Sequence, residues 1–193
     1  MKKLVLEAVF GAVVIGTVGV CSAKAEETKA LPKKDLIVYY SFSGKTELVA
    51  KTLADALKAD VVGIEDTTKP TKEQAYGPGK EASIQGKSWP IKPFNTDLSA
   101  YSRIFVGCPV WFSMPPPEFN AFVEQASITG KQVVVFVTYG GGGQAKAIKA
   151  MTDKIAGKGG NVVSSFSVKT GKATDDDIAA KAKEIAQQYM PQP

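Results

Sequence analysis

The sequence contains no histidine among its 193 residues. This absence excludes serine–histidine and cysteine–histidine catalysis, and it excludes metal sites with imidazole ligands. Cysteine is almost as scarce, because Cys21 and Cys108 are the only two. Their spacing matches no metal-ligand motif, and a disulfide framework is excluded. We interpret Cys108, at the end of an apolar run, as a small buried side chain and not as a nucleophile.

A dense block of lysine or arginine is also missing, although the formal net charge is +5. Positive charge is spread along the chain, so the composition does not favour nucleic-acid binding. The contents of 44% apolar and 22% charged residues are those of an ordinary globular protein. The length fits one domain with a sizeable core.

Residues 1–25 have the pattern of a secretory signal peptide. A positively charged start precedes an apolar segment at 4–20, and Ala23-Lys24-Ala25 is a small-x-small cleavage site. Residues 26–34 follow as a polar lead-in. We therefore expect an exported protein, periplasmic or secreted, with no stable membrane span after cleavage. Two alternatives stay open, namely a lipid anchor at Cys21 and an uncleaved signal anchor.

Apolar runs alternate with amphipathic segments along the rest of the chain. The apolar runs predict strands at 36–40, 61–64, 104–108, 133–137 and 162–168. The amphipathic segments predict helices at 45–58, 117–126, 144–156 and 174–189, the last one capped by Thr174. This alternation implies right-handed crossovers and a parallel sheet with helices on both faces. The sequence thus predicts a doubly wound, five-stranded α/β/α sandwich over residues 35–190.

Residues 66–100 do not fit this alternation. Prolines and glycines interrupt the segment repeatedly, so we expect an irregular loop without helices. A loop of this length in a compact domain is usually functional or mobile. We interpret its tryptophan, Trp89, as a packing residue, with contact to a ligand or substrate as the alternative.

The loop at 41–46 joins the first predicted strand to the first helix. Ser41, Ser43 and Thr46 offer hydroxyl groups there, and the positive end of the helix dipole points into the same volume. Gly44 allows close backbone approach, so the loop predicts a phosphate site. Lys45 either neutralises the phosphate or points into solvent. The simpler alternative is a plain turn with Thr46 as the helix N-cap.

A nucleoside-triphosphate P-loop is excluded at this loop. That motif needs a glycine five residues before Gly44, and Tyr39 occupies the position. The dinucleotide fingerprint Gly-x-Gly-x-x-Gly is also absent after the first predicted strand.

Two further loops leave carboxyl ends of predicted strands, the edge where parallel sheets bind ligands. Trp111 and Phe112 precede three prolines in one of them and predict an aromatic wall, with a satellite hydrophobic cluster as the alternative. Tyr139 precedes four glycines, 140–143, in the other. These glycines predict close backbone approach to a flat ligand, with a flexible turn as the alternative. Together the loops indicate a planar cofactor with one phosphate site.

These three loops resemble those of the flavodoxin family. Residues 40–46 look like its FMN phosphate loop, 107–112 resemble its Gly-x-Pro-x-Trp-Trp stretch, and 138–141 resemble its third flavin-contacting loop. The resemblance covers roughly residues 35–189. It implies the short-chain form of the fold, with strand order 2-1-3-4-5, and noncovalent FMN.

By position, the resemblance also implies which residues contact the flavin. The phosphate would be held by Ser41, Phe42, Ser43, Gly44, Lys45 and Thr46. The ring would be lined by Pro109, Val110, Trp111 and Phe112, and its edge met by Thr138, Tyr139, Gly140, Gly141 and Gly142. It implies no catalytic side chain and no metal.

The leading interpretation is an exported electron carrier that exchanges electrons with a redox partner protein or a small acceptor. Two alternatives are an FMN-dependent NAD(P)H:quinone-type reductase and a flavin-free binding module.

Overall fold

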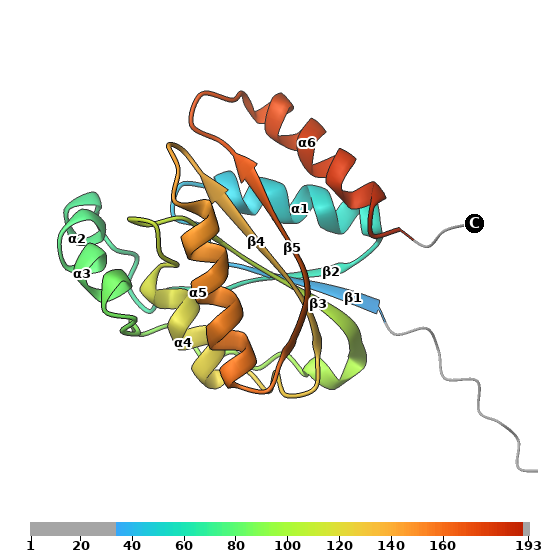
Figure 1. Ribbon diagram of the computed structural model, residues 1–193, viewed down its shortest axis with the longest axis horizontal. Helices are drawn as coiled ribbons and strands as arrows, with labels where there is room; N and C mark the ends of the chain where they lie inside the picture. The colour runs from blue at the N-terminus through green and yellow to red at the C-terminus, as the bar shows by residue number, and fades with distance from the viewer. Residues whose placement is uncertain (1–33, 191–193) are drawn as a thin grey trace, which may run out of the picture. The chain divides into compact units, whose positions relative to one another are not determined.

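Five parallel strands form the central sheet of the computed structural model, which describes residues 34–190 (Figure 1). In spatial order they are β2 (Asp60–Gly63), β1 (Lys34–Tyr39), β3 (Tyr101–Pro109), β4 (Gln132–Tyr139) and β5 (Asn161–Lys169). Every neighbouring pair runs parallel. This order confirms the predicted doubly wound topology. The predicted signal peptide and most of the polar lead-in, up to residue 33, lie outside the described residues.

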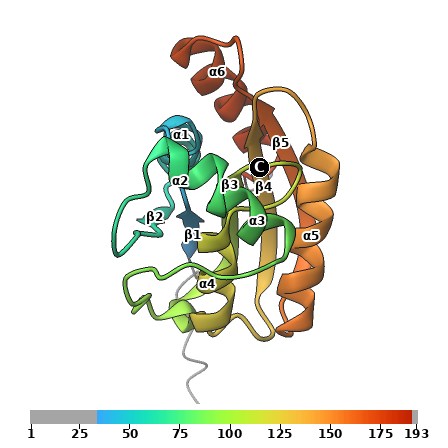
Figure 2. The same ribbon diagram turned by 90° about the vertical axis from the view of Figure 1, so that its left-hand side faces the viewer.

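Two pairs of helices cover the two faces of the sheet. One face carries α1 (Lys45–Leu57) and α6 (Asp175–Gln187), and the other carries α4 (Pro117–Gln125) and α5 (Gln144–Gly157). Figure 2 shows α1 and α5 on opposite sides of the strands. The central strands are therefore buried on both faces, which explains their nearly continuous apolar sequence.

Alternate side chains of the strands fill two separate cores. On β3, Val106 packs under α4 and α5, whereas its neighbour Phe105 packs under α1 and α6. Leu36 and Ile37 divide between the same two cores on β1, and all four side chains are fully buried. The period of two along a strand thus supplies both helix layers.

Most predicted elements are present with ends shifted by a few residues. The largest shift is at β3, which begins at Tyr101. The predicted cap of α6 is confirmed, because Thr174 Oγ1 accepts a hydrogen bond from the Asp177 N–H at 3.2 Å and Asp177 accepts one from the Thr174 N–H at 3.0 Å.

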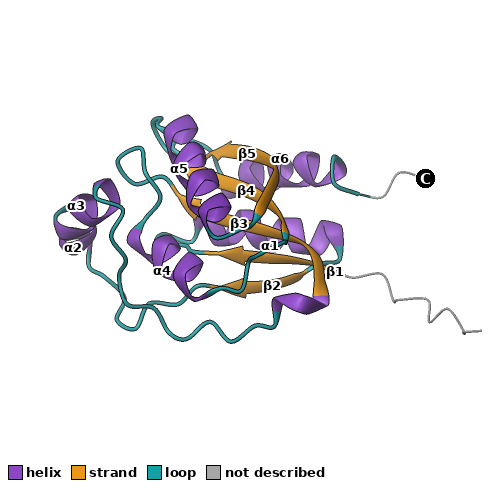
Figure 3. Ribbon diagram, turned by 60° about the horizontal axis from the view of Figure 1, so that its bottom comes forward, coloured by secondary structure: helices purple, strands orange, loops and turns teal. Residues whose placement is uncertain are grey.

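The prediction of a helix-free segment at 66–100 is wrong. This segment contains α2 (Lys72–Tyr76), α3 (Pro78–Ile84) and the short 3-10 helix η1 (Leu98–Ala100). Thr71 Oγ1 accepts a hydrogen bond from the Gln74 N–H at 3.2 Å, and the Gln74 side chain accepts one from the Thr71 N–H at 2.8 Å. This capping box starts α2, and Pro78 suits the first turn of α3. Figure 3 shows α2 and α3 together at one end of the sheet.

Within residues 34–190, none of the helices has the length and apolar character that a membrane crossing requires.

Candidate functional site

A cavity of about 680 Å³ lies at the carboxyl edge of the sheet. All three loops predicted to contact a ligand line it, through Phe42, Ser43, Lys45, Pro109, Val110, Trp111, Thr138, Tyr139 and Gly140. The volume falls within the range of roughly 300–1,000 Å³ that is usual for cofactor and small-molecule sites. The remaining predicted residues do not line it: Ser41, Gly44, Thr46, Phe112, Gly141 and Gly142.

The first loop is a tight turn between β1 and α1. Ser41 Oγ accepts a hydrogen bond from the Gly44 N–H at 3.1 Å, and Gly44 has a φ of 87°. Glycine suits this left-handed conformation because it has no Cβ. Gly44 is the N-cap of α1, and no side chain in the described part of the protein caps this helix. The first-turn N–H groups and the dipole of α1 therefore favour an anion at this point.

Thr46 does not act as the N-cap of α1, so that alternative is wrong. Its side chain is 1% exposed, and its hydroxyl lies 2.7 Å from the Thr138 hydroxyl at the end of β4. The Thr46 hydroxyl thus connects the first loop to the third.

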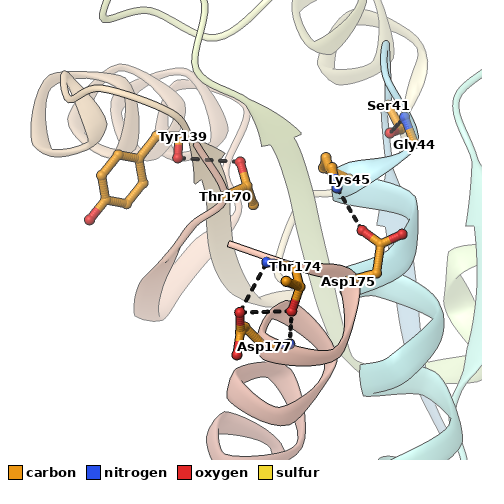
Figure 4. A network of polar contacts seen from close by, with 8 residues as sticks. All are labelled: Ser41, Gly44, Lys45, Tyr139, Thr170, Thr174, Asp175 and Asp177. Atoms are coloured by element: carbon orange, nitrogen blue, oxygen red, sulfur yellow. Dashed lines mark hydrogen bonds and ion pairs between the residues drawn. The ribbon is translucent and has the colours of Figure 1, made fainter. Parts of the chain in front are cut away.

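Lys45 stands at the start of α1 and lines the cavity. Its Nζ also donates to Asp175 Oδ1 in the first turn of α6 at 2.6 Å, as Figure 4 shows. Asp176 and Asp177 follow in the same turn. The ammonium charge is therefore shared between the cavity and the acidic first turn of α6. The sequence suggests only that Lys45 neutralises a phosphate or points into solvent.

Trp111 forms part of the cavity wall and is fixed by other rings. Its ring centroid lies 5.5 Å from that of Phe42, 6.3 Å from that of Tyr40 and 6.5 Å from that of Trp89, all edge-to-face. A Cβ on Gly79 of α3 would come within 3.0 Å of both tryptophan rings. Trp89 thus packs behind Trp111 and is not among the residues that line the cavity, consistent with the packing interpretation.

The turn after Trp111 directs Phe112 out of the main cavity. Trp111 and Met114 exchange two backbone hydrogen bonds of 2.9 Å, and Phe112 and Ser113 between them have φ values of 51° and 66°. Such a turn normally carries glycine or asparagine. The Phe112 ring contacts that of Tyr76, with 5.8 Å between centroids. It lines a hollow of about 140 Å³ with Phe42, Ala75, Tyr76, Val110 and Trp111.

The glycine-rich third loop allows close packing of neighbouring backbones. A Cβ at Gly143, the N-cap of α5, would lie 2.4 Å from Ser113 Oγ. A Cβ at Gly171, after β5, would lie 2.6 Å from the Gly140 carbonyl oxygen. These glycines bring three loops together around one site.

Four residues that line the cavity were not predicted from the sequence. Lys72, Glu73 and Tyr76 come from α2, and Thr170 follows β5. The Thr170 N–H donates to the Tyr139 carbonyl oxygen at 2.8 Å, and its hydroxyl donates to the same oxygen at 3.3 Å (Figure 4). The capping box at 71–74 signals α2. The position of Thr170 follows from the rule that all parallel strands end at one edge.

A group of titratable side chains lies behind Trp111. The pKa of Glu118 is raised to about 8, mainly by burial and in part by the nearby Asp66 carboxylate. Burial also raises the pKa values of Asp66, of Tyr40 and of the fully buried Cys108. Cys108 is thus buried as predicted. Within residues 34–190, no group of three or more histidine, cysteine or acidic side chains could hold a metal ion.

Solved structures with the same fold come from several bacteria. A protein from Bacteroides uniformis ATCC 8492 aligns with a TM-score of 0.66 and 22% identity, over 79% of this chain and 99% of its own. A flavoprotein from Lactobacillus acidophilus NCFM, in complex with FMN, aligns with a TM-score of 0.62 and 24% identity, over 70% of this chain and 93% of its own. Oxidised flavodoxin 2 from Bacillus cereus aligns with a TM-score of 0.54 and 21% identity, over 81% of this chain and 97% of its own.

At these identities the solved structures establish the fold alone. A comparison with curated proteins finds no match. The family model for flavodoxin matches residues 34–184, which is most of the chain. The protein therefore belongs to the flavodoxin family.

Proposed function

We propose that this protein binds FMN noncovalently in the cavity at the carboxyl edge and acts as an exported electron carrier. The observation that carries the proposal is the convergence of the phosphate-type turn, Trp111 and the loop at 138–140 on one cavity. Membership of the flavodoxin family and the FMN complex of the Lactobacillus acidophilus relative support the choice of cofactor.

The residues of the cavity fit this cofactor. Beside Gly44, a Cβ would meet no atom within 4 Å, so there is open space next to the N-terminus of α1. Ser43 and Lys45 would hold the phosphate there, through a hydroxyl and an ammonium group. Trp111 and Tyr139 would contact the planar ring, and bound FMN would supply one- or two-electron transfer.

The surrounding protein would position the cofactor and exclude water. Trp111 is fixed by three rings, so little side-chain entropy remains to be lost when it contacts a planar ligand. The wall is extended by Pro109, whose ring is rigid, and by Val110.

A desalting experiment tests the cofactor. The purified protein is mixed with FMN and desalted, and its visible absorption spectrum is recorded. Retained flavin bands that are shifted from those of free FMN would support the proposal. A colourless protein that is folded by circular dichroism would overturn it and favour a flavin-free binding module.

The hollow of about 140 Å³ favours a second candidate, an FMN-dependent reductase of small acceptors such as quinones. Phe42, Val110, Tyr76 and Trp111 line both this hollow and the main cavity, so a small planar molecule there would lie beside the cofactor. Turnover of NAD(P)H with a quinone by the FMN-loaded protein would support the reductase. Reduction by a protein donor without NAD(P)H turnover would support the carrier.

Export and partner choice belong to the same proposal. The pattern of residues 1–25 supports secretion. Cleavage after Ala25 removes Lys2, Lys3, Lys24 and Glu7, which lowers the net charge from +5 to +3, and this positive charge favours a redox partner with an acidic docking surface. Sequencing the N-terminus of protein from the exported fraction tests cleavage after Ala25. An intact Met1 in that fraction would contradict it.

A further inference from the structure

Glu118 is the most anomalous buried group in the described chain. It lies in the first turn of α4 with an exposed fraction of 0%, and neither carboxylate oxygen has a hydrogen-bond partner within residues 34–190. An unpartnered buried carboxylate is costly, whereas a neutral carboxyl group is tolerated far better. The position therefore favours a bound proton.

The groups that interact with Glu118 come from three other segments. Tyr40 lies directly after β1, Asp66 in the loop after β2, and Cys108 on β3. The Tyr40 hydroxyl donates to Asp66 Oδ2 at 3.4 Å. The exposed Lys69 lies near Asp66 and favours its charged form, which leaves Glu118 as the better site for the proton.

These groups connect solvent on one side with the cofactor cavity on the other. Asp66 lines a hollow of about 350 Å³ with Gln74 and Trp89, through which a proton can exchange with water. Tyr40 directly precedes the phosphate-type turn, and its ring contacts Trp111 of the cavity wall.

We propose that Glu118 and Asp66 bind one proton behind the cofactor cavity, and that this proton and FMN stabilise each other's binding. The proton site itself stands independently of the cofactor, whereas the coupling rests on the function proposed above. Ionised Glu118 would place a negative charge behind a cavity that receives an anionic phosphate. Coupling free energies between two sites are reciprocal. If the proton favours FMN binding, bound FMN must make the protein hold this proton more tightly.

Proton uptake on FMN binding tests the coupling. Calorimetric titrations at pH 8 in two buffers of different ionisation enthalpy give the number of protons taken up per FMN. The FMN phosphate is fully ionised at this pH, since its second pKa is about 6, and it contributes no proton. We expect a fraction of a proton per FMN for the natural protein and none for Glu118→Gln.

Glu81→Gln is the matched control, because Glu81 is an exposed carboxyl on α3. It should take up as many protons as the natural protein. Equal uptake by the natural protein and Glu118→Gln would overturn the coupling.

An infrared titration without FMN tests the proton site separately. We expect a carboxylic-acid band at pH 6 that disappears above about pH 8 and is missing from Glu118→Gln. Asp66→Asn should move this titration to lower pH, and it provides the test if Glu118→Gln does not fold. A spectrum without this band at pH 6 in the natural protein would overturn the proton site. A normal band in a protein that binds no FMN would overturn only the proposed function.

Discussion

The buried carboxyl of Glu118 predicts that the protein loses stability as the pH rises from about 5 to about 9. The ordinary pKa of the group is 4.5, and the folded protein raises it to about 8 by burial. Between these values the unfolded chain ionises Glu118 while the folded chain keeps its proton. Stability from this group is therefore complete below pH 4.5 and is lost as the pH rises through 8.

The size of the effect follows from the separation of the two pKa values. Each pH unit within the window costs about 1.4 kcal/mol for one proton, so the whole window costs roughly 5 kcal/mol at most. The raised pKa of Asp66 acts in the same direction, whereas the raised pKa of Tyr40 matters only above pH 10. This loss is a large part of the 5–15 kcal/mol or so that usually stabilises a domain.

Urea unfolding of the protein without FMN, at pH 5, 7 and 9, measures this slope. Glu118→Gln cannot ionise, so its stability should fall by several kcal/mol less between pH 5 and pH 9 than that of the natural protein. Glu81→Gln should follow the natural protein. Parallel pH profiles for the natural protein and Glu118→Gln would refute the reasoning, because they would mean that Glu118 titrates alike in both states.

Three predictions concern the cavity and are measured by FMN titration. Gly44→Asp should abolish binding, because it places a carboxylate beside the phosphate position and a side chain at a φ of 87°; unchanged affinity would contradict the phosphate assignment. Trp111→Ala should weaken binding by a few kcal/mol at most, roughly one aromatic face, and unchanged affinity in a folded variant would exclude the wall role. Asp175→Asn should strengthen binding by about 0.2–1 kcal/mol by releasing Lys45, whereas Asp176→Asn, the control, should do so less; equal effects would mean that overall charge and not the ion pair matters.

The parts of the site that were predictable depend on local sequence. The turn at 41–44 needs only its glycine, its serine and the start of α1, all within a few residues. The three central strands, β1, β3 and β4, were predictable because burial on both faces gives continuous apolar runs. The helix α2 was missed because prolines and glycines outweighed the capping box that begins at Thr71.

Other parts depend on contacts that local sequence does not encode. Glu118 in the first turn of α4 is typical of an exposed residue that complements the helix dipole, and only the tertiary fold buries it completely. The orientation of Phe112 comes from two positive φ values in a turn without glycine or asparagine. Lys45 pairs with Asp175, which is 130 residues away.

The small side chains under α2 and α3 have a consequence for how a ligand enters. The buried residues of these helices are Ala75, Gly79, Ala82 and Ser83. Such side chains bury little apolar area. Local unfolding of α2 and α3 should therefore cost less free energy than unfolding of the sheet. Amide hydrogen exchange should then be faster at 72–84 than in β3 and β4, and FMN should slow it; exchange as slow as that of β3 would contradict this. Local opening of α2 and α3 would uncover the cavity and let a cofactor enter a chain that is already folded.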